Sequence, residues 1–192
     1  MENFRQDGNE VHQVGEVVLT DEEHQECQET LHFFLSTWKE QEDDKEGEFV
    51  IRKDFTETFQ RSIIAYSLMG RAERFLCMAG GSAIQATLHV PCICVTPIDP
   101  VLAEKACVTA AKACSVFPFS MHFYDFGCIL LQVGKEGEAA IAFREFLGRI
   151  EFDLADPWKQ GWLNQRSILA CMQFARKMIK ESIEADHPLP KS

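Results

Sequence analysis

Residues 123–143 read FYDFGCILLQVGKEGEAAIAF, and this stretch decides the fold. Apolar residues recur every three or four positions on both sides of Gly134, as in two helices joined by a short turn. Two small residues, Gly127 and Ala139, stand where such helices would cross, and aromatic residues would fill the space beside them. The stretch therefore predicts a helical hairpin.

The same periodicity predicts helices along most of the chain. Thr20, Asp99 and Asp156 each stand where a helix cap is favoured, and proline follows both aspartates. The expected helices cover residues 21–38, 54–80, 82–90, 100–115, 119–133, 135–152 and 158–185. The sequence therefore predicts the all-α class, with one domain over residues 21–186.

The remaining segments lack helical periodicity. Residues 1–20 are polar and predict a flexible acidic tail, and the run at 40–48 predicts a solvated linker after the acidic N-terminal helix. Residues 89–100 hold three prolines and predict a loop of extended character. Residues 187–192 are expected to form a loose C-terminal tail.

Residues 120–153 resemble a tetratricopeptide repeat (TPR), a 34-residue helix–turn–helix unit. The resemblance is carried by three large and three small positions: Phe123, Phe126, Gly127, Gly134, Ala139 and Phe143. Phe146 and Glu151 depart from the pattern, and the repeats on either side are only partly recognisable. The resemblance implies antiparallel hairpins stacked as a degenerate superhelix, with a C-terminal capping helix. An unrelated helical bundle is the alternative.

In this family one face of the first helix of a repeat lines a peptide-binding groove. The corresponding residues here are Met121, Tyr124, Cys128, Leu131 and Gln132. Because the other side of the same helix is also apolar, the sequence leaves open whether this face forms a groove or lies under another helix. The resemblance thus implies a non-enzymatic scaffold, chaperone or adaptor.

Charge is concentrated at the N-terminus. Residues 1–50 hold 15 acidic and 3 basic residues, a net charge of 3 − 15 = −12, whereas the whole chain carries −11. No basic footprint exists for a nucleic acid, so the expected partner is a protein or peptide, either basic or apolar. Acidity that only keeps the chain soluble is the alternative.

Size and acidity are also similar to those of the TPR-type (class II) chaperones of type III secretion. This similarity implies a secretion chaperone, and it makes the N-terminal helix a candidate for homodimerisation. The N-terminus has no basic and apolar segments typical of a secretory signal, and no apolar run is long enough to span a membrane. A cytoplasmic location with free thiols is therefore expected.

The chemistry of a catalytic or metal site is weakly represented. Cys92 and Cys94 with His89 lack the usual zinc-pair spacing, and a Cys128–His122 nucleophile has nothing to orient it. We expect no enzyme activity, no cofactor and no metal. The alternative function is a ligand-binding or regulatory domain with an apolar pocket among a cluster of phenylalanines: Phe117, Phe119, Phe123, Phe126, Phe143, Phe146 and Phe152.

Overall fold

The computed structural model describes residues 5–6, 9–10, 12–42, 53–84, 98–163 and 168–186. Most of these residues are helical, which confirms the all-α class. The helices are α1 (Asp21–Glu42), α2 (Lys53–Met78), α3 (Pro100–Val116), α4 (Ser120–Gln132), α5 (Glu136–Ala155), α6 (Pro157–Leu163) and α7 (Ile168–Asp186). Four short strands precede them: β1 (Arg5–Gln6), β2 (Asn9–Glu10), β3 (His12–Val14) and β4 (Val17–Leu19).

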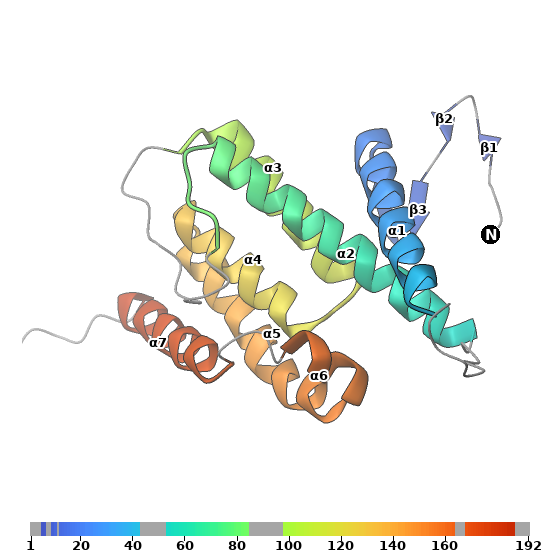
Figure 1. Cartoon of the computed structure of the whole chain (residues 1–192). Helices are drawn as coiled ribbons and strands as arrows, with labels where there is room; N and C mark the ends of the chain where they lie inside the picture. Colours follow the sequence, from blue (N-terminus) through green and yellow to red (C-terminus); the bar gives the residue numbers. More distant parts are fainter. Residues whose placement is uncertain are drawn as a thin grey trace, which may run out of the picture.

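The helices pack mainly with their neighbours in the chain (Figure 1). Helix α2 packs along α3, and α4 packs along α5. Contacts between α3 and α4 join these two pairs, and α1 crosses α2 at one end. Helices α6 and α7 both contact α5. One continuous apolar core therefore extends from α1 to α7.

The predicted helix caps are confirmed. The Asp99 carboxylate accepts hydrogen bonds from the backbone N–H groups of Val101 (2.8 Å) and Leu102 (3.1 Å) at the start of α3. Before α1, Thr20 and Glu23 form a capping box, in which each side chain accepts the backbone N–H of the other residue. These side chains satisfy N–H groups that have no partner within their own helix.

The hairpin of α4 and α5 is built on two glycines. Gly134 ends α4 with φ of 78°, and the N–H of Lys135 donates to the Leu130 carbonyl (2.9 Å) in a Schellman motif. Gly127 faces the ring of Phe143 so closely that an added Cβ would lie 2.7 Å from the ring edge. Ala139, one helical turn before Phe143 on the same face of α5, is also buried. The small residues therefore allow the close packing that the sequence predicts.

The N-terminal segment differs from the flexible tail expected over residues 1–20. Strands β3 and β4 pair as an antiparallel hairpin, with Gly15 at the positive φ of 62° that a two-residue turn favours. Val14 and Val17 pack against the core, and Leu19 is buried in it. Apolar residues on either side of this short turn therefore anchor the segment before α1 to the domain.

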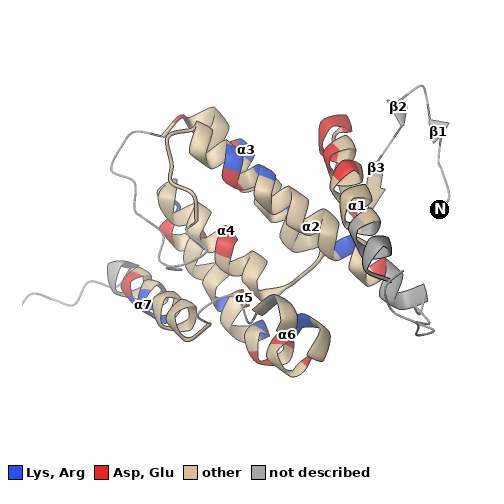
Figure 2. Ribbon diagram, in the orientation of Figure 1, with Lys and Arg blue, Asp and Glu red and all other residues tan. Residues whose placement is uncertain are grey.

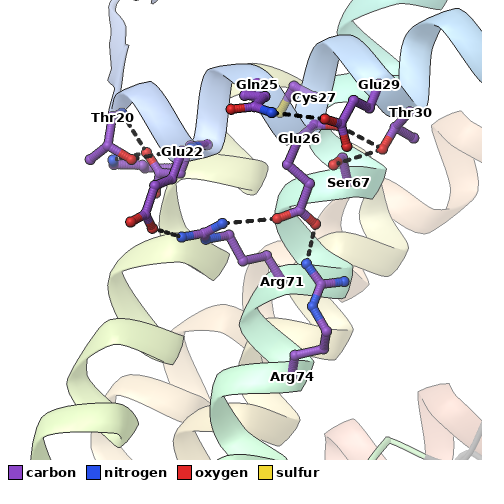
Figure 3. Close-up of polar contacts among 12 residues, drawn as sticks. Thr20, Glu22, Gln25, Glu26, Cys27, Glu29, Thr30, Ser67, Arg71 and Arg74 are labelled. Atoms are coloured by element: carbon purple, nitrogen blue, oxygen red, sulfur yellow. Dashed lines mark hydrogen bonds and ion pairs between the residues drawn. The ribbon is translucent and has the colours of Figure 1, made fainter.

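Helix α1 docks on the domain both through the buried Cys27 and through charge. Acidic residues gather at its start (Figure 2), and Arg71 of α2 bonds to both Glu22 and Glu26 (Figure 3). Arg74 also pairs with Glu26. Glu23 is buried and forms a 2.6 Å ion pair with Lys112 of α3. The acidity of this helix thus matches basic residues of its own chain and does more than solvate a surface.

Asp153 of α5 joins three helices. One oxygen of its buried carboxylate accepts the backbone N–H of Ser120 at the start of α4, at 2.7 Å. The other oxygen bonds to Nζ of Lys159 in α6, at 2.6 Å. This carboxylate therefore caps α4 from a distance of 33 residues in sequence and fixes α6 beside it.

Some predicted segments differ from those in the structure, and others lie outside the described residues. The helix expected over 158–185 is present as two helices, α6 and α7. The helix expected from residue 82 is absent at 82–84, where the chain is irregular. The rest of that helix, most of the proline-containing loop, most of the linker at 40–48 and the tail at 187–192 lie outside the described residues. Among the described helices, none is long and apolar enough to cross a membrane.

Candidate functional site

The face predicted to line a peptide groove lies in the protein interior. Met121, Tyr124, Cys128 and Gln132 are buried, and Leu131 is half-buried. The alternative left open by the sequence, burial under another helix, is therefore what the structure shows for this face. An open peptide groove on this side of α4 is not present in the arrangement of the described residues.

Helix α7 is the element that helps to cover this face. The ring of its Phe174 packs edge-on against Tyr124 (6.4 Å between centroids) and Phe143 (5.8 Å). Cys171 and Ala175 of α7 are fully buried. Burial raises the pKa of Tyr124, and the neighbouring thiols of Cys128 and Cys171 raise it further, so the phenol stays protonated.

Gln132 has a structural role. Its side-chain amide donates to the backbone carbonyl of Ser82 (2.9 Å), and its amide oxygen accepts the Ser82 N–H (2.8 Å). This pair of bonds satisfies both backbone groups of a residue that belongs to no helix or strand. Gln132 therefore holds the segment that follows α2 against the end of α4.

An open groove lies instead between α4 and α5, on the side away from Phe143 and Phe174. The volume of this groove is about 270 Å³. Its lining is apolar along α4 and mixed along α5: Phe123, Phe126, Leu130, Glu138, Ile141, Ala142 and Glu145. Pockets for drug-sized molecules span about 300–1,000 Å³, so this smaller groove suits a few side chains of a partner.

The groove combines exposed apolar side chains with charge. Ile141 is 59% exposed and lies between Glu138 and Glu145 on the solvent-facing side of α5. Glu145 pairs with Arg149 at 3.1 Å, and the Arg149 guanidinium lies 4.9 Å from the ring centre of Phe123. The groove thus has an apolar floor, an acidic rim and one arginine at its end.

The sequence contains one indication of this groove: large apolar residues on the charged side of α5. The repeat pattern did not point to them. The core side of α5 carries Ala139, Phe143, Phe146 and Ile150, all buried. On the opposite, charged side, Ile141 and Phe152 are large apolar residues, and Phe152 is 78% exposed. Apolar residues on the polar face of a helix mark an interaction surface or an isolated exposed residue. The proximity of Ile141 to Phe123 and Phe126 could be seen only in the structure.

The phenylalanine cluster does not form a sizeable ligand pocket around Phe117 and Phe119. The cavity beside them, lined also by His122 and Trp158, measures about 10 Å³. A cavity needs roughly 10–15 Å³ to hold even one water molecule. Phe119, Phe143 and Phe146 are buried as core, and Phe123 and Phe126 line the groove. This arrangement favours packing over the alternative function.

Of the described cysteines, all except the exposed Cys77 are buried and suited to packing. Burial raises the pKa of Cys27 to about 11, and it also raises the pKa of Cys107 and Cys114. Thiols with raised pKa values are poor nucleophiles. In the parts of the chain that the structure covers, no cluster of three or more metal-ligating side chains occurs. Cys92, Cys94 and His89 lie outside the described residues.

Comparisons of the chain with protein-family models, with curated proteins and with solved structures found no match.

Proposed function

We propose that this protein is a non-enzymatic protein-interaction module that binds an apolar helical segment of a partner in the groove between α4 and α5. The observation that carries the proposal is the groove itself: about 270 Å³, with Phe123, Phe126 and Leu130 along one wall and the exposed Ile141 along the other. Exposed apolar side chains that lie together, here Ile141 beside Phe123 and Phe126, are a feature of interaction sites.

A helical partner suits the shape. Two packed helices present a groove parallel to their axes, into which a third helix can insert apolar residues at positions i, i+3 or i+4, and i+7. Glu138 at the rim favours lysine or arginine beside those apolar residues, whereas Glu145 is already paired with Arg149. The preferred partner segment is therefore an amphipathic helix with basic residues at the edge of its apolar face.

The tetratricopeptide-like arrangement is part of the same proposal. The pairing of α2 with α3 and of α4 with α5, and the contact of α3 with α4, are compatible with two stacked hairpins. A chaperone or adaptor that shields an apolar segment of a client would use such a groove. The class of type III secretion chaperones is the narrower form of this idea.

The direct test is to screen a display library of amphipathic helical peptides for binding to the full chain. We expect enrichment of peptides with three apolar positions on one side and basic flanking residues. Replacement of Ile141 by glutamate places a charge in the groove and should weaken binding at least about tenfold, which corresponds to about 1.4 kcal/mol. The matched control is Phe33→Glu, because Phe33 is 64% exposed on the distant helix α1.

A charge change at the rim adds a second readout. Glu138→Lys should shift the enriched flanking residues from basic to acidic, because the rim would then repel lysine and arginine. Failure to enrich any helical peptide, or binding that is equally strong in the Ile141→Glu and Phe33→Glu proteins, would overturn the proposal.

A further inference from the structure

Helix α7 carries more apolar surface than its contact with the domain covers. Five residues spaced three or four apart share one side of the helix and form what we term the α7 edge: Leu169, Met172, Arg176, Ile179 and Ile183. Leu169 is 73% exposed and Ile183 is 47% exposed, while Met172 and Ile179 are half-buried. Met172 and Ile179 also pack partly against the core, so the α7 edge is open mainly at Leu169, Arg176 and Ile183.

The way in which α7 packs on the domain explains why part of this edge remains exposed to solvent. The fully buried residues of α7 are small, Cys171 and Ala175, and they lie beside the large ring of Phe174. These residues pack toward Tyr124 and Phe143, so the helix rests on the domain by one side. The neighbouring side, which holds Leu169 and Ile183, faces away from that contact.

The α7 edge and the α4–α5 groove are complementary. The groove offers apolar walls with Ile141 exposed and Glu138 at the rim, while Glu145 is already paired with Arg149. The edge offers apolar side chains with Arg176 exposed between them. An apolar helix edge with a basic residue matches an apolar groove with an acidic residue in both hydrophobicity and charge.

Within one molecule the two surfaces cannot meet in this structure. Helix α7 packs on the side of the α4–α5 pair where Tyr124 and Phe143 meet Phe174, and the groove opens on the side of Phe123 and Phe126. A second copy can supply the missing contact without displacing α7 from its own domain.

We propose that the α7 edge of one copy occupies the α4–α5 groove of a second copy, so that the chain self-associates head to tail. This inference rests on the proposed function, since it needs the groove to accept a helix. Each contact joins two different surfaces and leaves one groove and one α7 edge free at the ends. Such an assembly either closes into a ring or continues to grow.

Sedimentation velocity over a concentration series tests this arrangement with the full chain. The wild-type protein should sediment above the 21.9 kDa monomer as concentration rises. Ile141→Glu blocks the groove and Leu169→Glu blocks the α7 edge, so each variant alone should remain monomeric. Phe33→Glu, the matched control outside both surfaces, should associate as the wild type does.

The mixture of the two blocked variants is decisive. The Ile141→Glu chain keeps an intact α7 edge, and the Leu169→Glu chain keeps an intact groove. Together they should form a 1:1 dimer that grows no further, although neither associates alone. A pairing of α7 with α7 would instead be abolished by Leu169→Glu, unaffected by Ile141→Glu and not restored by mixing, and this result would overturn the inference.

A synthetic peptide of residues 168–186 separates this inference from the proposed function. We expect it to bind the wild-type chain and to bind Ile141→Glu at least about tenfold more weakly. If the chain is monomeric throughout, the inference is wrong, and the proposed function survives only if library peptides still bind in an Ile141-dependent way. If the peptide binds equally to both proteins, it does not use the groove, and the inference is again overturned.

Discussion

Replacement of Gly127 by alanine tests the closest helix contact in the fold. An alanine Cβ would lie 2.7 Å from Cε1 and 2.9 Å from Cδ1 of Phe143, inside van der Waals contact. The ring has little room to retreat, because Tyr124 and Phe174 pack against it with centroids at 5.7 and 5.8 Å. The added methyl group must therefore push α4 and α5 apart or strain the ring.

Two effects of opposite sign decide how much Gly127→Ala changes the free energy of unfolding. Overpacking a well-packed core costs about 1–3 kcal/mol, and the pinned ring places this site at the upper end. Replacing a glycine inside a helix by alanine gains about 1 kcal/mol. We therefore expect a net loss of about 1–2 kcal/mol, and for a chain of this size each kcal/mol lowers Tm by about 2–4 °C.

The assay is urea unfolding followed by circular dichroism, with two comparison proteins. Gly148 of α5 has no atom within 4 Å of an added Cβ, so Gly148→Ala should raise the free energy of unfolding by up to about 1 kcal/mol. Combining Gly127→Ala with Phe143→Leu should cost less than the sum of the two changes, because the smaller side chain makes room. Equal stabilisation by Gly127→Ala and Gly148→Ala would refute the proposed close contact.

Three further predictions concern polar contacts. Lys112→Met leaves the buried carboxylate of Glu23 without its ion pair and should destabilise the fold by about 1.5–3 kcal/mol in urea unfolding. The additional change Glu23→Gln should recover part of that loss. Gln132→Ala removes both bonds to the Ser82 backbone, should cost about 1–3 kcal/mol and should speed amide exchange in residues 81–84 before the rest of the chain. Burial raises the pKa of Glu26, but hydrogen bonds and charges from its two arginine partners outweigh burial and lower it below the usual 4.5. Its stabilising contribution is therefore present above that value and lost as the pH falls through the lowered pKa, so Glu26→Gln should flatten the acid side of a stability–pH profile.

Local signals in the sequence predicted the helices well. Thr20 and Asp99 cap helices where expected, and Gly134 ends α4, because each acts on the few residues beside it. Small residues at the helix crossing, Gly127 and Ala139, were predicted from the repeat spacing, and the structure identifies Phe143 as the ring beside Gly127. The hairpin before α1 was missed because its strands have only three residues each, too few for an alternating pattern to stand out.

The functional surface was less predictable, for a physical reason. Helix α4 is apolar on nearly all sides, so its sequence cannot show which side another helix covers. The answer depends on α7, whose Phe174 lies 50 residues after Tyr124, packs on it and leaves Phe123 and Phe126 on the other side. The TPR resemblance directed attention to the covered side.

The two contacts of the Asp153 carboxylate, one with Ser120 and one with Lys159, have a consequence for local unfolding of the domain. Its carboxylate is shared by the first N–H of α4 and the ammonium group of Lys159, so neither helix end can leave without removing a partner from a buried charge. The start of α4 and the short α6 should therefore share one opening free energy in hydrogen exchange. A seven-residue helix that would not persist alone becomes part of the cooperative unit of the domain.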